Sequence, residues 1–326
     1  MFIFLLNFLI RRLCQGVLIV LIVSFTIFAL LRIIPGDPVR LMLGPMTPDN
    51  VVEQTAKTLG LRDPIPIQYV RYLNKVVHGD LGTSFIRAPS GESVGGNQDR
   101  QRGERAKVFD LIAETLPFTI QLAAMALLFA MLLAIPLGVI AGLYADRWPD
   151  RLAVYASSVF VSTPNFWLGI VLALLLTVRL GWIPSIGYGN FAYTILPAVV
   201  IAIEMAPLFI RALSVSVAAT MQQPFVEVGR LRGLTESRVF FHHVLRNSAV
   251  PILNLFGVQL GALLGGVLIV EYIFSYPGLG FLTVQAVVQR DFPTIQGIAM
   301  LTSTVFVVIN IVVDLISTTI DRRLDF

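Results

Sequence analysis

The sequence predicts an all-α polytopic membrane protein with six transmembrane helices and a small extracytoplasmic region after the first. Of its 326 residues, 56% are hydrophobic and 13% are charged, whereas a soluble domain carries about 25% charged residues. Because polar surface is too scarce to face water, the chain must face lipid. Crossing about 30 Å of hydrocarbon takes roughly 20 helical residues. Six apolar stretches reach that length, at about 13–31, 117–142, 153–178, 194–218, 250–273 and 294–320.

The first segment, 1–31, is predicted to hold a cytoplasmic N-terminus and the first span. Arg11 and Arg12 precede an apolar run and so mimic a secretory signal. The run of about 19 residues is too long for such a signal and no A-x-A site follows it, so we expect no cleavage. Cys14 is the only cysteine, which excludes an internal disulfide. We expect it to be a small apolar residue facing lipid or a neighbouring helix.

The segment 32–116 is the predicted extracytoplasmic region. It opens with Pro-Gly-Asp-Pro over 35–38, which is typical of a rigid turn. Apolar residues at helical spacing predict two short amphipathic helices over 49–60 and 66–78, each ended by a glycine. We expect these helices to lie on the membrane surface or to cover a cavity mouth. The stretch 87–107 is nearly free of apolar residues and predicts a flexible, solvated loop rather than a partner contact.

The membrane domain, 117–320, contains four polar residues that are candidates for pathway or interhelical contacts. Such residues are costly at membrane depth and usually face protein or water. Glu204 either lines a pathway or pairs toward Arg211, two turns away, and Glu271 lies near the outer end of the fifth span. Asn310 and Asp314 are one turn apart in the sixth span. We expect these two to hydrogen-bond a neighbouring helix.

Small residues recur at helical spacing in the fifth span, at Gly257, Gly261 and Gly265. A glycine groove lets helix backbones approach closely in lipid. We therefore expect a packing face, used either within the chain or against a second, similar subunit. Gly138 and Gly142 give a weaker version of the pattern in the second span. The prolines expected to kink their spans are Pro136 and Pro164.

The arginine distribution predicts the orientation. Six spans place both termini on one side, and cytoplasmic loops of membrane proteins are enriched in arginine and lysine. With both termini inside, including the tail 321–326, only Arg179 and Arg290 lie in the two short outer loops, 179–193 and 274–293. Ten arginines lie in the short inner segments: Arg11, Arg12, Arg147, Arg151, Arg230, Arg232, Arg238, Arg246, Arg322 and Arg323.

The inner loop 219–248 is the most informative part of the chain. Reversing direction needs only a few residues, but this polar, basic segment has about 30 and carries helical spacing. Gly233 is placed as a helix stop and Thr235 as the cap of a second helix. The segment therefore predicts two helices held outside the bilayer and presented to a partner.

Several sites are absent from the sequence. It contains neither the G-x-x-x-x-G-K-[ST] loop that binds nucleotide phosphates nor H-E-x-x-H. The three histidines, His78, His242 and His243, are badly spaced for a metal site and none lies in a predicted span. We therefore predict no catalytic residues, no metal and no cofactor in this chain.

Short motifs along nearly the whole chain resemble those of the B-type permease subunit of bacterial dipeptide, oligopeptide and nickel importers of the ABC superfamily. Each motif alone is weak, but their combination is highly specific. The motifs are Arg32-Ile-Ile-Pro-Gly-Asp-Pro38, Leu59-Gly-Leu61, Gln68-Tyr-Val-Arg-Tyr72, Gly79-Asp-Leu-Gly-Thr-Ser84, Glu114-Thr-Leu-Pro117, Pro164 with Phe166-Trp167, Gly181-Trp-Ile-Pro184, Leu196-Pro197, Tyr276-Pro-Gly-Leu-Gly280 and Arg290-Asp291.

This resemblance implies the type I ABC importer permease fold and identifies 219–248 as the coupling, or EAA, loop that docks into an ATPase subunit. The family pattern is E-A-A, three residues, then G. Here Val228 and Gly229 replace the two alanines, and Arg246 stands where many importers outside this family have proline. The implied coupling residues are Glu227, Val228, Gly229, Arg230, Arg232, Gly233, Leu234, Thr235 and Leu245.

The resemblance also implies a location, partners and a cargo. The chain would form half of a pathway across the bacterial inner membrane, paired with a homologous C-type permease. Two ATPase subunits, which bind ATP and magnesium, and an extracytoplasmic solute-binding protein would complete the importer. The expected cargo is a dipeptide or oligopeptide, with nickel, opines, glutathione and oligosaccharides as alternatives.

Two other functions compete with this interpretation. A stand-alone secondary transporter predicts inverted repeats around a midplane ion site, but no internal repeat is visible and the inner loop would have no role. A membrane-embedded enzyme would need the catalytic residues that the sequence lacks. Binding of an ATPase through 219–248 separates the importer from both.

Overall fold

The computed structural model describes residues 2–33, 38–43, 46–58, 60–86 and 105–320. Within them the chain is helical, apart from one isolated β-bridge between Thr83 and Lys107. The chain divides into two compact units. The first comprises Met1–Pro117 with Gly278–Val308, and the second comprises Phe118–Pro277 with Ile309–Phe326.

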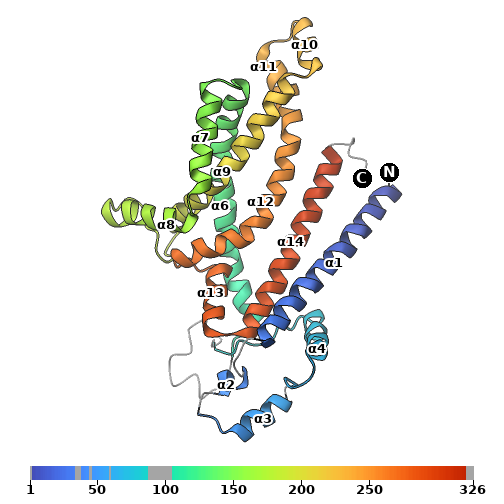
Figure 1. Ribbon diagram of the computed structural model, residues 1–326, viewed down its shortest axis with the longest axis vertical. Helices are drawn as coiled ribbons and strands as arrows, with labels where there is room; N and C mark the ends of the chain where they lie inside the picture. Colours follow the sequence, from blue (N-terminus) through green and yellow to red (C-terminus); the bar gives the residue numbers. More distant parts are fainter. Residues whose placement is uncertain (1, 34–37, 44–45, 59, 87–104, 321–326) are drawn as a thin grey trace. The chain divides into compact units, whose positions relative to one another are not determined.

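The first unit confirms the two short helices predicted after the first span. Gly60 and Gly79 follow them with φ of +66° and +81°, a conformation that glycine adopts without strain. Residues 35–37 of the predicted turn and most of the loop 87–107 lie outside the described residues. The helices of this unit (Figure 1) are α1 (Phe2–Ile33), α2 (Pro38–Leu43), α3 (Asp49–Thr58), α4 (Ile65–Val77), the start of α6 (Val108–Leu143), α13 (Leu279–Gln289) and the start of α14 (Phe292–Ile320).

Helix α4 is bonded to α1 through the Gln68-Tyr-Val-Arg-Tyr72 motif. The Tyr69 hydroxyl lies 2.6 Å from the Ser24 hydroxyl, and its ring packs edge-on against Phe28. One turn further along α1, Arg32 Nε donates to Gln68 Oε1 at 2.9 Å. The second amphipathic helix is thus held to the first span by buried polar and aromatic contacts.

A buried carboxylate joins two motifs that are more than 200 residues apart. Asp291 accepts hydrogen bonds from the Ser84 hydroxyl at 2.5 Å, from the Phe85 amide at 2.9 Å and from the Thr294 hydroxyl at 2.7 Å. Three donors satisfy a carboxylate that is only 2% exposed. The Gly79–Ser84 motif and the Arg290-Asp291 motif therefore form one structural element.

Replacement of Asp291 by asparagine is expected to lower the melting temperature of the purified complex. The amide keeps one acceptor oxygen but turns a nitrogen donor toward groups that already donate. A hydrogen bond to a charged group contributes about 1.5–3 kcal/mol. The matched control is Asp110→Asn at an exposed carboxylate of the same unit. Equal melting temperatures for the two variants would contradict the bonding scheme.

The second unit is built around α9, which packs against α7, α8 and α12 (Figure 1). The α9 face toward these helices is buried and apolar, including Leu196, Ile201 and Phe209. The unit also holds the remainders of α6 and α14. Its other helices are α7 (Trp148–Ser162), α8 (Asn165–Leu172), η1 (Ala173–Arg179), α9 (Ala192–Met221), α10 (Pro224–Leu231), α11 (Glu236–Val239), η2 (Phe240–Val244) and α12 (Leu245–Ile273).

Among the described residues, four helices are long and apolar enough to cross a membrane, and a bent pair gives a fifth candidate. The predicted fifth span, 250–273, lies within α12, where the side-chain surroundings of several residues are not described. The four single helices are Leu9–Ile33, Val108–Leu143, Ala192–Met221 and Phe292–Ile316.

The predicted span over 153–178 is broken at Pro164, where only a kink was expected. The segment forms α7 and then α8 with η1, bent by 92° where the two meet. Pro164 has no amide hydrogen to continue the ladder, and it pushes Thr163 into extended backbone with ψ of 119°. By contrast, α6 runs without interruption past Pro136 and begins at Val108, earlier than predicted.

The glycine pair predicted to be the weaker one, Gly138 and Gly142, brings the backbone of α6 close to that of α9. A β-carbon at Gly138 would lie 2.9 Å from the Ile210 carbonyl oxygen, and one at Gly142 would lie 2.7 Å from the Ser214 carbonyl oxygen. The backbone of α6 therefore rests on the backbone of α9, as small residues permit in lipid.

The predicted glycine face of α12 packs within the chain at its first position. A β-carbon at Gly257 would lie 2.4 Å from Val313 Cγ1 of α14. Gly261 is also buried, whereas the surroundings of Gly265 lie outside the described residues. Whether this face also meets a second subunit stays a prediction.

Candidate functional site

A helical hairpin connects α9 to α12 and lies beyond their ends in the second unit (Figure 1). Gly233 has φ of +77°, its amide donates to the Arg230 carbonyl at 2.9 Å, and the Leu234 amide donates to the Gly229 carbonyl at 3.2 Å. These two bonds form a Schellman motif, so the predicted helix stop at Gly233 is confirmed. Thr235 occupies the N-cap position of α11, but its hydroxyl makes no capping bond.

The inner side of the hairpin is a small apolar core. Val226, Val239 and Val244 are buried against Leu213 and Val217 of α9. Hydrophobic contacts therefore fix the hairpin to the end of the long helix.

A glycine at the centre of the hairpin allows its helices to touch. A β-carbon at Gly229 would lie 3.3 Å from Val239 Cγ2 and 3.8 Å from Leu234 Cδ1. Contact at 3.3 Å leaves room for a methyl group only after a small shift. A small residue is therefore needed where the family pattern has its second alanine.

The outer side of the hairpin presents an apolar stripe. Phe225, Val228 and Leu231 recur at every third residue of α10 and are 38%, 46% and 81% exposed. Glu227 is exposed beside them, while Leu245, at the start of α12, is half-buried. Contiguous exposed apolar side chains are typical of protein contact sites.

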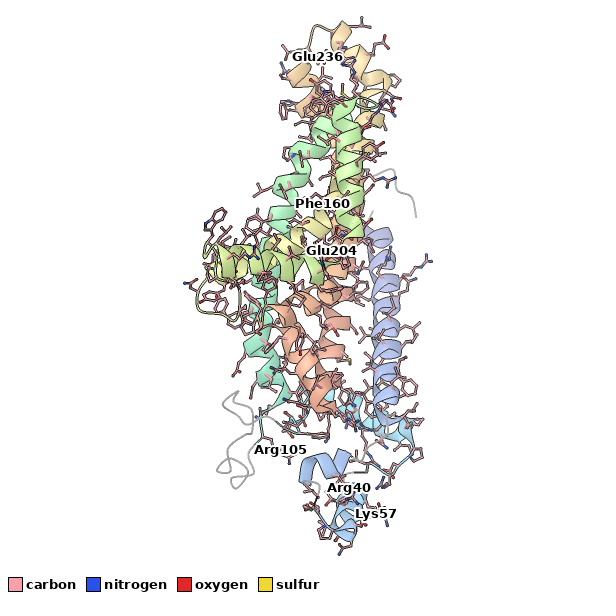
Figure 2. All side chains as sticks on the ribbon, turned by 60° about the vertical axis from the view of Figure 1, so that its left-hand side comes forward. Arg40, Lys57, Arg105, Phe160, Glu204 and Glu236 are labelled. Carbon is pink, nitrogen blue, oxygen red and sulfur yellow. The ribbon has the colours of Figure 1, made fainter. Side chains whose placement is uncertain are left out.

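The basic residues of the hairpin fall into two groups. Arg230 forms a two-pronged ion pair with Glu236, with bonds of 2.8 Å and 3.1 Å, and Figure 2 shows Glu236 at the far end of the second unit. Arg232 and Arg238 are exposed. Arg232 and Arg238 thus present positive charge on the surface of the hairpin.

The four polar candidates within the spans lie in different surroundings. Glu271 is fully buried and accepts a 2.7 Å bond from the Thr119 hydroxyl, which ties α12 to α6. Asn310 and Asp314 lie half-buried on α14. Glu204 is exposed on α9 (Figure 2) and accepts a 2.9 Å bond from Asn165 Nδ2. It is bonded to the first residue of α8 and not to Arg211.

A second polar cluster was not predicted from the sequence. The Tyr276 hydroxyl lies 3.1 Å from the Thr194 hydroxyl, which also accepts a 2.9 Å bond from Gln121. Burial raises the pKa of Tyr276, and the bond to Thr194 partly offsets that shift. Phe118 and Tyr188 surround the Tyr276 ring edge-on. Tyr276 of the Tyr-Pro-Gly-Leu-Gly motif therefore ties the segment after α12 to α6 and α9.

A cavity of about 620 Å³ opens between the C-terminal half of α9 and the N-terminal part of α12. Most of its wall is apolar, and Arg211 is the one charged residue among those that line it. Serine and threonine hydroxyls close one side, where Ser216 Oγ donates to the Ser248 carbonyl at 3.1 Å. Lining residues include Leu208, Arg211, Val215, Asn247, Pro251 and Leu255.

Comparison with known protein families decides the class of the chain. The family described as "Binding-protein-dependent transport system inner membrane component" matches residues 134–326, and the N-terminal part of such components matches residues 5–123. The chain belongs to this family. It is therefore a multi-pass inner-membrane permease subunit of an ABC importer, is not itself catalytic, and leaves ATP to partner ATPases.

Curated relatives and solved structures agree with this assignment. The glutathione transport system permease proteins GsiC of Salmonella paratyphi A and Escherichia coli K12 are each 33% identical over 321 residues, covering 98% of this chain and 99% of theirs. A chain of the inward-facing MetNI methionine ABC transporter is similar in two crystal forms, with TM-scores of 0.55 and 0.54 at 17% identity. It covers 65–66% of this permease and 97–98% of its own length.

Family membership sets aside the stand-alone secondary transporter and the membrane-embedded enzyme. An ABC permease implies ATPase and binding-protein partners. Sequence reasoning did not predict Asn165 as a partner of Glu204, or Thr194 and Tyr276 as an anchor. The only sequence signal for these contacts is the presence of polar residues near span ends. A single sequence does not show which of those residues bond to each other.

Proposed function

We propose that this permease subunit forms half of the pathway of a peptide importer and that the 219–248 hairpin couples it to an ATPase. The observation that carries the proposal is the exposed stripe of Phe225, Val228 and Leu231 on a hairpin whose other side is packed onto α9. Apolar side chains that protrude from a braced helix favour insertion into a complementary cleft. Arg232 and Arg238 add positive charge around that contact.

The proposed assembly contains a homologous C-type permease, two ATPase subunits and an extracytoplasmic solute-binding protein. Six spans would cross the membrane, formed by α1, α6, the α7–η1 pair, α9, α12 and α14, with both termini in the cytoplasm. The excess of arginine in the inner segments supports this orientation. The glutathione systems named for the relatives favour a dipeptide or short peptide as cargo.

Crosslinking tests the coupling assignment. In a Cys14→Ser background, the Glu227→Cys and Thr235→Cys variants are each expected to form a disulfide with a cysteine placed in the ATPase cleft. Lys57→Cys on the exposed side of α3 is the matched control and should form none. The proposal fails if neither hairpin position reaches the ATPase, or if the purified permease transports cargo without it.

A further inference from the structure

Arg211 is an unusual residue for a membrane span. It lies in the interior of α9, its side chain is exposed, and among the described residues it has no hydrogen bond or ion pair. A guanidinium within a membrane span usually faces water, a partner or a ligand, because facing lipid is costly. It lines the 620 Å³ cavity together with apolar neighbours such as Leu208 and Val215.

Glu204 supplies the opposite charge on the same face of the helix. Seven residues separate it from Arg211, which is two helical turns, or about 10 Å along the axis. Leu208, between them, is also exposed, so one stripe of α9 carries both groups. Asn165 holds Glu204 Oε2 at 2.9 Å. That bond orients the carboxylate and leaves Oε1 without a partner among the described residues.

The space beside this stripe suits a small solute. Ligand sites in proteins usually measure about 300–1,000 Å³, with apolar walls and a few placed polar groups, and the cavity at Arg211 has that size and composition. Among the α9 residues that line the cavity, Leu208 is the nearest to Glu204 in the sequence. Glu204 lies one helical turn from it, outside the cavity wall. A solute that contacts both charges would extend from the cavity along α9.

We propose that Glu204 and Arg211 form a transient binding site, called the station below, for a short zwitterionic peptide in transit. The site would contact the peptide at two points. Glu204 would accept the terminal ammonium group and Arg211 the terminal carboxylate. An extended chain spans about 3.3–3.6 Å per residue, so a tripeptide covers about 10 Å, which matches the separation of the two groups along α9. The inference rests on the proposed peptide cargo and adds the groups that recognise it.

Uptake by the whole importer, reconstituted in liposomes with its binding protein, tests the station. The rate of each variant is divided by the wild-type rate for the same cargo, which cancels the selectivity of the binding protein. Arg211→Gln is expected to slow uptake of a free tripeptide about tenfold or more, the loss typical of a charged hydrogen bond. Its effect on the C-terminally amidated tripeptide should be less than about twofold.

Glu204→Gln should give the mirror result, slowing the free tripeptide but not its N-acetylated form. Arg211→Lys is the matched variant that keeps the charge, and it should recover most of the uptake.

A second measurement does not depend on transport. In a Cys14→Ser background, Leu208→Cys should react with water-soluble thiosulfonates, and faster with an anionic reagent than with a cationic one. Adding Arg211→Gln should remove that preference. A Leu208→Cys thiol that does not react would place the stripe against lipid or protein and would overturn the proposal.

The remaining outcomes are also decisive. If wild-type importer takes up no peptide, the proposed function fails. If it takes up peptide but both variants slow free and blocked peptides equally, only the station fails. If Arg211→Gln instead prevents the partner permease from co-purifying, Arg211 is an assembly contact and the station is overturned.

Discussion

Replacement of Gly142 by leucine should leave almost no folded permease in the membrane. A β-carbon there would lie 2.7 Å from the Ser214 carbonyl oxygen and from Val217 Cβ. A backbone carbonyl of α9 cannot rotate away as a flexible side chain could. The two helices would have to separate, and overpacking of this kind typically costs about 1–3 kcal/mol or more. The yield of monodisperse protein after detergent extraction measures the effect.

The control for this change is leucine at Ala124, an exposed position of the same helix. Ala124→Leu adds the same kind of bulk without facing another helix, and its yield should equal that of the wild type. Gly138→Leu should behave like Gly142→Leu, since it faces the Ile210 carbonyl oxygen at 2.9 Å. Normal yields for both glycine variants would refute the close crossing of α6 and α9.

Substitution of Gly233 by valine should abolish transport while leaving membrane insertion intact. No atom lies within 4 Å of where its β-carbon would be, so a clash is not the cause. The cause is the φ of +77°, which costs an ordinary residue about 1–2 kcal/mol and a β-branched residue more. The turn between α10 and α11 would then move the exposed stripe. Uptake per inserted permease measures the loss.

Asparagine at the same position is the informative comparison. Among residues with a side chain, asparagine adopts positive φ most readily, so Gly233→Asn should keep much of the uptake that Gly233→Val loses. Stimulated ATPase activity should fall together with transport in the valine variant. Equal uptake by the wild type and Gly233→Val would show that the turn geometry does not transmit motion.

Features set by local chemistry could be predicted from the sequence. The helices at 49–60 and 66–78 are each marked by apolar residues at helical spacing and by a glycine that ends them. Gly233 likewise lies where one helix ends and the chain turns into the next. Pro164 was expected to kink its span, but the 92° bend at this position was not predicted. A proline only removes one hydrogen bond and restricts its neighbour, and the surrounding packing decides between a kink and a break.

Contacts between distant residues were beyond such reasoning. Nothing near Ser84 in the sequence indicates Asp291, and a glycine pair does not reveal whether it faces a backbone or a side chain. From the sequence, Glu204 could either pair with Arg211 or line a pathway. Only the fold places Asn165 beside it and leaves Arg211 exposed.

The Ser84–Asp291 bond also has a consequence for biosynthesis. The acceptor lies 207 residues after the donor, so a ribosome adding about 5–20 residues per second needs about 10–40 s to supply it. During that interval the Ser84 hydroxyl and the Phe85 amide have only water or transient neighbours to bond. The segment around Ser84 therefore matures late, when nearly all of the polypeptide has been made, and a truncated chain that ends before Asp291 should leave it open to proteases.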